Sequence, residues 1–290
     1  MKLALGTVQF GMSYGINNRQ GKVPFSQVHK ILEESYNNKI DTLDTAFSYG
    51  ESEEIIGNTL GGKNWKIITK TPHFTSEKIS DTEVKYLDKS FNISLSKLGV
   101  KNVYGLMVHD CDDLFKIGGE LLFEKMKELK SSGLVEKIGV SVYREDQIEY
   151  LLNNFDIDII QLPINVFDQR LLVRGCLKRL KNKNIEIYAR SIFLQGLLLM
   201  SLESVPSYFK PIAQQLYEFD QISNRLSVNK LSLALGFVNS IKEIDKIVIG
   251  IDSVVQLKQI IKANKIKINP IDFDRFSMNN QFIDPSLWDL

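Results

Sequence analysis

Eight short runs rich in Val, Ile and Leu alternate with longer amphipathic segments along the chain, and this alternation restricts the fold more than any other feature. Runs of this length and composition are typical of buried β-strands. We predict strands at Leu3–Val8, Ile40–Asp44, Lys66–Lys70, Val103–His109, Lys137–Ser141, Ile157–Leu162, Ile185–Arg190 and Lys246–Ile249.

Helical periodicity characterises the segments between these runs. In residues 81–98 the apolar positions lie three or four residues apart, which places them on one face of a helix: Val84, Leu87, Phe91, Leu95 and Leu98. The predicted helices lie at Ser26–Asn37, Ser52–Leu60, Asp81–Leu98, Glu120–Ser132, Arg144–Asn154 and Asp168–Asn182, with a further helical region at Tyr208–Ile241.

Buried strands that alternate with helices indicate a parallel sheet covered by helices, and eight such units are the number that closes a barrel. The 290 residues suit one barrel and contain no linker or low-complexity tract that would separate two domains. We therefore predict the α/β class, with a single-domain (β/α)8 TIM barrel over residues 1–290 and a C-terminal tail at residues 270–290.

Composition excludes several classes of function. With 43% hydrophobic residues, 24% charged residues and a net charge of +1, the chain gives no reason to expect a nucleic-acid partner. Cys111 and Cys176 are far apart, and the three histidines lack the spacing of metal ligands, so we expect neither a disulfide nor a metal site. The apolar runs are too short for a membrane span or a signal peptide, which predicts a cytoplasmic protein.

Three successive predicted strands end in ionisable residues. Asp44, Lys70 and His109 end the second, third and fourth strands, and Tyr49 follows the second. Because parallel strands of a barrel end at the same rim, we expect these four side chains to converge. The Lys70 ammonium would lower the pKa of the Tyr49 phenol, Asp44 would pair with Lys70, and His109 would hydrogen-bond a carbonyl oxygen that Tyr49 protonates.

The motifs around these residues resemble those of the aldo-keto reductase family. They read Asp-Thr-Ala-Phe-Ser-Tyr-Gly from Asp44, Ile-Thr-Lys-Thr around Lys70 and Met-Val-His-Asp around His109, and the similarity extends over nearly the whole chain. The resemblance implies hydride transfer from a nicotinamide cofactor to an aldehyde or ketone, with Tyr49 as the general acid. It also implies that Asp44, Lys70 and His109 are catalytic.

The resemblance further implies where the cofactor lies. Ser141 and Gln161 match positions that hydrogen-bond the nicotinamide carboxamide. The loop over the pyrophosphate would contain Ser191, Gln195, Gly196 and Leu197, and the adenosine half would meet Gly250, Asp252, Ser253, Gln256 and Lys258. The basic residue that often meets the 2′-phosphate of NADP is replaced at these positions, so NADP and NAD both remain open as cofactors.

Two departures lie beside the expected nicotinamide. Val142 stands where many members have Asn, and Arg190 stands where many have an aromatic residue that stacks on the ring. A guanidinium at this position either stacks on the nicotinamide or binds an anionic group of the substrate. Arg190, with Arg144 and Arg170, favours an acidic or phosphorylated carbonyl compound such as a sugar derivative.

Two other functions remain open. The altered surroundings at Val142 and Arg190 also suit a cofactor-binding regulatory or interaction protein with little turnover. A Schiff-base lyase using Lys70 is the second alternative, although a carboxylate partner such as Asp44 would keep this lysine protonated. The sequence does not indicate the physiological substrate or the oligomeric state.

Overall fold

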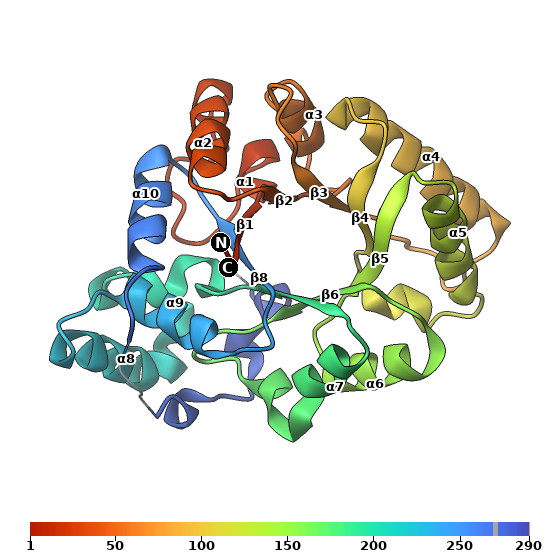
Figure 1. Cartoon of the computed structure of the whole chain (residues 1–290). Coiled ribbons are helices and arrows are strands. Elements are labelled where there is room, and N and C mark those ends of the chain that lie inside the picture. Colours follow the sequence, from red (N-terminus) through yellow and green to blue (C-terminus); the bar gives the residue numbers. More distant parts are fainter. Residues whose placement is uncertain (269–271, 290) are drawn as a thin grey trace.

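The computed structural model describes residues 1–268 and 272–289, and its parallel strands close into one barrel with helices around it (Figure 1). In order around the barrel, the strands are β1 (Leu3–Gly6), β2 (Thr42–Asp44), β3 (Lys66–Lys70), β4 (Val103–Val108), β5 (Val135–Ser141), β6 (Ile159–Pro163), β7 (Glu186–Arg190) and β8 (Lys246–Gly250). Pairing between β8 and β1, with Leu3 opposite Ile247, closes the ring. The predicted barrel is thereby confirmed.

Helices surround the strands on the outside of the ring (Figure 1). The α-helices are α1 (Val8–Gly11), α2 (Phe25–Asn37), α3 (Ser52–Gly57), α4 (Asp81–Leu98), α5 (Glu120–Ser131), α6 (Glu145–Asn154), α7 (Cys176–Asn182), α8 (Ala213–Arg225), α9 (Lys230–Ser240) and α10 (Val254–Ala263). Short 3-10 helices add η1 (Cys111–Leu114), η2 (Arg170–Gly175), η3 (Leu194–Leu199), η4 (Leu202–Ser204), η5 (Ser207–Ile212), η6 (Asp274–Phe276), η7 (Gln281–Ile283) and η8 (Pro285–Leu287).

The structure corrects some of the predicted bounds. The first strand ends at Gly6 rather than Val8, because the chain turns there into α1. The predicted helix Asp168–Asn182 is divided into η2 and α7, since Gly175 adopts a left-handed conformation with φ of 69°. The sequence prediction also missed α10, which begins after the N-cap residue Ser253.

Local signals explain why α4 matches its predicted bounds. Ser80 and Glu83 form a capping box at its first turn, and this arrangement satisfies backbone N–H groups that the helix leaves free. Gly99 ends the helix in the left-handed region with φ of 64°, where glycine has no steric penalty. The helix is therefore defined at both ends by its own sequence.

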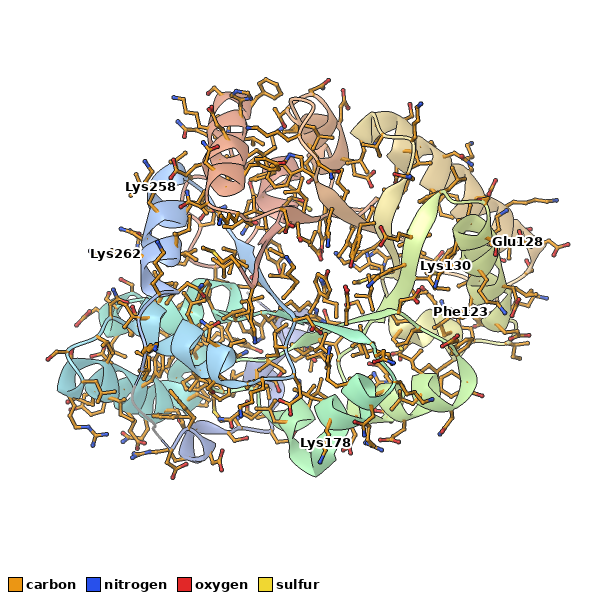
Figure 2. The ribbon with its side chains drawn as sticks, viewed as in Figure 1. Phe123, Glu128, Lys130, Lys178, Lys258 and Lys262 are labelled. Carbon is orange, nitrogen blue, oxygen red and sulfur yellow. The ribbon has the colours of Figure 1, made fainter. Side chains whose placement is uncertain are left out.

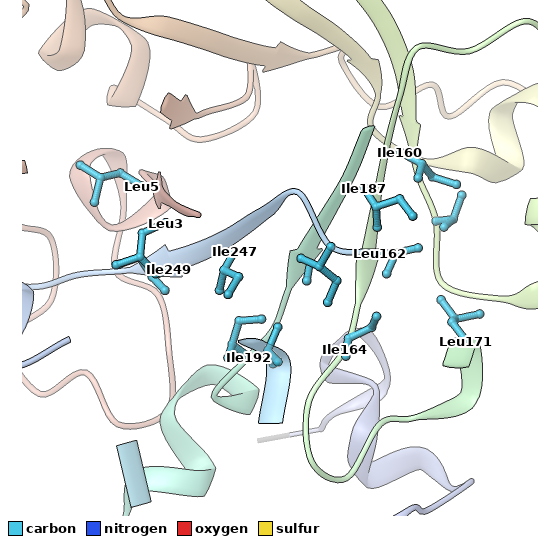
Figure 3. Close-up of a cluster of buried hydrophobic side chains, with 14 of the residues drawn as sticks. Leu3, Leu5, Ile160, Leu162, Ile164, Leu171, Ile187, Ile192, Ile247 and Ile249 are labelled. Atoms are coloured by element: carbon cyan, nitrogen blue, oxygen red, sulfur yellow. The ribbon is translucent and has the colours of Figure 1, made fainter. Parts of the chain in front are cut away.

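The apolar side chains form an outer and an inner layer. The outer layer joins strands to helices and includes the residues labelled in Figure 3 on β1, β6, β7 and β8: Leu3, Leu5, Ile160, Leu162, Ile187, Ile247 and Ile249. A separate inner cluster contains Ile68, Met107, Ile159 and Tyr188. Because strand side chains alternate, the next inward positions are two residues further along, and these are Lys70, His109, Gln161 and Arg190. Strand geometry thus directs these four side chains toward the inside of one rim.

The C-terminal segment packs against the segments that follow β6 and β7. Met278 donates its backbone N–H to the Phe167 carbonyl at 2.9 Å, and the Trp288 ring lies edge-on to Phe209 at 4.9 Å. Residues 270, 271 and 290 of the predicted tail lie outside the described residues. Within the part of the chain that the structure describes, no helix has both the length and the apolar character needed to cross a membrane.

Candidate active site

A buried ion pair forms the floor of the site. Asp44 ends β2, Lys70 ends β3, and both side chains are buried and joined in an ion pair. Lys70 Nζ also donates to the Thr45 carbonyl at 2.9 Å, and Gln161 Nε2 donates to the second carboxylate oxygen of Asp44. Burial is the largest single effect and favours loss of the Lys70 charge, but the interactions with Asp44 and Tyr49 together outweigh it and raise the lysine pKa. Lys70 is therefore held as a charged ammonium.

Tyr49 lies above this ion pair on the turn between β2 and α3. Lys70 Nζ lies 5.0 Å from the centroid of the Tyr49 ring. Burial raises the pKa of Tyr49, and this effect outweighs the Lys70 charge that lowers it. The net direction is opposite to the sequence expectation, because depth in the cavity contributes more than the neighbouring ammonium. Tyr49 is therefore neutral and keeps a proton that it can donate.

The turn that presents Tyr49 depends on close backbone packing against α1. A Cβ atom added at Gly11 would lie 1.8 Å from the Tyr49 carbonyl oxygen and 2.5 Å from the Ser52 backbone nitrogen. A side chain at this position would push the Tyr49 turn away from the barrel. Gly11 therefore fixes the height of Tyr49 above the strand ends.

His109 follows β4 and faces Tyr49. Their ring centroids are 5.7 Å apart with an interplanar angle of 82°, and the His73 ring lies on His109 at 4.3 Å. Ser48 Oγ lies 3.2 Å from His109 Nδ1, and the backbone N–H of His109 donates to Thr71 Oγ1 at 3.1 Å. Burial lowers the pKa of His109 to about 2, with a further decrease from the Lys70 charge. The imidazole is therefore neutral.

One cavity of about 610 Å³ joins these residues to most of the predicted cofactor positions. The four predicted catalytic residues line it: Asp44, Tyr49, Lys70 and His109. Most predicted cofactor residues line it as well, namely Ser141, Gln161, Arg190, Ser191, Gln195, Gly196, Gly250, Asp252 and Gln256. The structure thus brings together residues from β1 at one end of the sequence to α10 at the other.

Three predicted cofactor residues do not line this cavity. Leu197 is buried in the hydrophobic core, and Ser253 caps α10 by accepting from the Gln256 backbone N–H at 3.2 Å. Lys258 lies on the outer side of α10 and forms an ion pair with Glu34 of α2 at 3.5 Å (Figure 2). Lys258 is therefore occupied by a structural contact outside the cavity.

Arg190 ends β7 and stacks on Tyr143. Its guanidinium carbon lies 4.0 Å from the centroid of the Tyr143 ring. Arg190 Nη1 donates to Ser191 Oγ and Nη2 donates to the Val142 carbonyl, both at 3.2 Å. Val142 and Arg190, the two departures from the family pattern, are therefore joined by a hydrogen bond to the Val142 backbone carbonyl.

Arg144 and Arg170 do not line the cavity that contains Arg190. Arg144 is exposed and pairs with Asp112 and Asp146, whereas Arg170 pairs with Asp168. Neither lines the cavity, so the sequence expectation that they join Arg190 is wrong.

Several cavity residues were missed by sequence reasoning. They lie on loops or within helices α1 and α10 rather than at strand ends, and they include Gln9, Tyr14, Asn17, Tyr143 and Gln259. Gln9 lies in the run Leu5-Gly6-Thr7-Val8-Gln9-Phe10-Gly11, which is part of the resemblance to the family, and this run is the sequence signal for its position.

The two cysteines do not contribute a catalytic thiolate or a metal site to the cavity. Burial raises the pKa of Cys111, which argues against a thiolate nucleophile beside His109. Among the described residues, the group with metal-ligand atoms close together is Glu145, Glu149 and Cys176, outside the barrel, where Arg179 already pairs with Glu149. Neither feature adds to the site.

Comparisons of the sequence with known proteins match one enzyme family. A sequence profile of the aldo/keto reductase family matches residues 2–279. An uncharacterized oxidoreductase of Bacillus subtilis is 26% identical over 254 residues, covering 80% of this chain and 80% of that protein. The L-galactose dehydrogenase of Arabidopsis thaliana is 25% identical over 281 residues, covering 90% of this chain and 85% of that protein.

Solved structures share the fold. An aldo-keto reductase of Bacillus halodurans in its holo form superposes with a TM-score of 0.74 at 19% identity, covering 99% of this chain and 92% of that one. A glycerol dehydrogenase of Gluconobacter oxydans gives a TM-score of 0.71 at 21% identity, with coverages of 92% and 88%. The family match and the oxidoreductase relatives support an enzyme of carbonyl reduction in general terms. Because the family profile spans nearly the whole chain, the protein belongs to the aldo/keto reductase family.

Proposed function

We propose that the protein reduces an aldehyde or ketone to an alcohol with NADH or NADPH, and that residues 1–290 act as one catalytic domain. The observation that carries this proposal is the neutral Tyr49 above the buried Asp44–Lys70 ion pair, inside a cavity that extends to Asp252. A proton donor and a fixed positive charge beside it are what a carbonyl oxygen needs as it gains negative charge.

Each residue has a distinct role in the proposal. A bound nicotinamide cofactor would supply the hydride for the carbonyl carbon. Tyr49 donates its proton to the carbonyl oxygen, and the nearby Lys70 ammonium stabilises the phenolate that remains. His109 donates a hydrogen bond to the same oxygen from its neutral ring, while Asp44 holds Lys70 in place and itself accepts a hydrogen bond from Gln161.

The cavity has features that fit a dinucleotide. Gln9 Oε1 and Asp252 Oδ1 line it as buried acceptors without a hydrogen-bond partner among the described residues, so a ligand with hydroxyl or amino donors would satisfy them. Ser191 and Gln195 adopt positive φ values of 58° and 52°, a strained backbone of the kind found where loops contact ligands. In the proposal this loop, with Gly196, holds the pyrophosphate, and Ser141 and Gln161 hold the carboxamide.

The alternative functions are weighed against the same site. The Asp44 interaction that raises the Lys70 pKa argues against a Schiff-base lyase, which needs an uncharged amine. A regulatory protein with little turnover would require the same cofactor site without a working proton donor. The neutral Tyr49 beside Lys70 and His109 favours turnover.

Two measurements on the purified protein test the proposal. The first is the rate of NADH or NADPH oxidation with a panel of aldehydes and ketones, and the second is a fluorescence titration of the protein with each cofactor. Cofactor binding together with carbonyl-dependent oxidation supports the proposal. Cofactor binding without hydride transfer over the whole panel contradicts it and favours the regulatory function. A mass increase at Lys70 after borohydride treatment with a carbonyl compound would favour the Schiff-base function instead.

A further inference from the structure

The charges at the Tyr49 end of the cavity do not cancel. Asp44 and Lys70 neutralise each other in their ion pair, and the His109 ring is neutral. Arg190 lines the same part of the cavity, and within residues 1–268 and 272–289 it forms no ion pair with a carboxylate. One guanidinium charge therefore remains uncompensated on the wall beside the predicted reacting groups.

The guanidinium is fixed in position. Tyr143 covers one face, Ser191 accepts from Nη1 and the Val142 carbonyl accepts from Nη2. A guanidinium has five N–H donors, so the two that Ser191 and Val142 accept leave donors for a ligand. Because its supports are a neutral ring, a hydroxyl and a carbonyl, the charge is held in place without being neutralised.

Arg190 also lies close enough to the reacting groups to influence them. Burial has the largest effect on the pKa of His109, and the charges of Lys70, His73 and Arg190 lower it further. Burial also has the largest effect on Tyr49, where the Arg190 charge acts in the opposite direction and lowers the pKa. Because Tyr49, His109 and Arg190 also line one cavity, a ligand whose carbonyl oxygen reaches Tyr49 can place another group against Arg190.

We propose that Arg190 binds an anionic oxygen group, a carboxylate or a phosphate, of the carbonyl substrate. This inference rests on the proposed function, because it assigns a substrate class to the same site. A fixed guanidinium fork matches the paired oxygens of both groups. The binding of such a group supplies the counter-ion that the described chain does not provide.

Two matched substrate pairs test the inference. Succinic semialdehyde is compared with butanal, and glyceraldehyde 3-phosphate with glyceraldehyde, so that each pair differs in one anionic group. We expect kcat/KM of the wild-type enzyme to favour the anionic member of at least one pair by roughly tenfold or more. Preference within the first pair identifies a carboxylate, and preference within the second identifies a phosphate.

The variants separate charge from other effects. Arg190→Gln should reduce the preference within the pair by about tenfold or more, and Arg190→Lys should restore part of it as a point charge. Arg144→Gln is the matched control, because it removes the same charge from an exposed arginine outside the cavity. It should leave the preference unchanged. A thermal melt of each variant identifies any loss of folding.

A binding measurement makes the result independent of turnover. Calorimetric titration of the protein with succinate and with inorganic phosphate should show binding of at least one anion, which Arg190→Gln abolishes. Equal kcat/KM within both pairs, or anion binding that survives in Arg190→Gln, would overturn the inference. An equal decrease for all four substrates, together with weaker NADH binding, would assign Arg190 to the cofactor and overturn it as well. Absence of turnover with every carbonyl compound contradicts the proposed function, and the anion titration then decides Arg190 alone.

Discussion

The ammonium of Lys70 lies 5.0 Å from the centre of the Tyr49 ring while it forms a buried ion pair with Asp44. Removal of the Tyr49 hydroxyl leaves this charge in place but takes away the proton. We expect Tyr49→Phe to lower kcat by roughly 10²–10⁴-fold, the range typical of general acid catalysis, with the NADH dissociation constant unchanged. Steady-state kinetics and a fluorescence titration measure the two quantities.

Tyr143→Phe is the matched control for this variant. It removes a phenolic hydroxyl from the same cavity but keeps the ring that stacks on Arg190. We expect its kcat to change by less than about tenfold, well below the effect of a lost general acid. Wild-type turnover in Tyr49→Phe would show that the proton comes from another group.

The Asp44–Lys70 pair should also be important for stability. Lys70→Met leaves the Asp44 carboxylate buried without its counter-ion, so we expect a loss of roughly 3–5 kcal/mol in the free energy of unfolding. Adding Asp44→Asn to this variant removes the uncompensated charge and should recover part of the loss. Urea unfolding of both single variants and the double variant measures this coupling. A single-variant loss below about 1 kcal/mol would contradict it.

The sequence was sufficient to predict the barrel and the four residues at its rim. Strand periodicity is local to each strand, and the alternation of eight strands with helices indicates parallel pairing, so the two together place Asp44, Lys70 and His109 on one rim. Only their depth was misjudged, since the buried surroundings of Tyr49 outweigh the Lys70 charge.

Contacts between elements far apart in the sequence could not be predicted in the same way. Arg190 stacks on Tyr143 and Lys258 pairs with Glu34 because tertiary packing brings different elements together. The second contact depends on the packing of α10 against α2 on the outside of the barrel. The residue spacing within α10 or α2 does not indicate which residue of the other helix forms the contact.

The His109 pKa makes stability depend on pH. The folded pKa is about 2 because the ring is buried, whereas the unfolded value is near 6.5. Below about pH 6.5 the unfolded chain binds a proton that the folded chain does not, so stability decreases as the pH falls. This residue contributes up to about 1.4 kcal/mol per pH unit in that range. Denaturation of wild type and His109→Asn between about pH 7 and about pH 5 should show a shallower decrease in the variant. Equal slopes would contradict this prediction.

Ser48 should determine which nitrogen of His109 carries the proton. Its hydroxyl lies 3.2 Å from Nδ1, and donation to that atom leaves the proton on Nε2, where it can reach a carbonyl oxygen. Nitrogen-15 NMR of the three histidines reads the tautomer directly. We expect an unprotonated Nδ1 in wild type, a mixture of tautomers in Ser48→Ala and the wild-type pattern in Ser48→Thr. A protonated Nδ1 in the wild-type protein would refute this role.

Asp252 should favour NADH over NADPH. Its Oδ1 has no hydrogen-bond partner among the described residues, and reciprocal hydrogen bonds with Gln256 hold the other parts of the residue. Lys258 does not line the cavity and pairs with Glu34 of α2, so it does not face this carboxylate in the structure. A carboxylate accepts hydrogen bonds from ribose hydroxyls and repels a 2′-phosphate. A carboxylate at this position therefore predicts a preference for the cofactor without the 2′-phosphate.

Fluorescence titration should show that NADH binds more tightly than NADPH by about tenfold or more. Asp252→Asn keeps the shape of the side chain and removes its charge, so it should reduce the difference between the two dissociation constants. Asp252→Arg should reverse the preference. If the wild-type protein binds NADPH at least as tightly as NADH, the carboxylate does not select the cofactor.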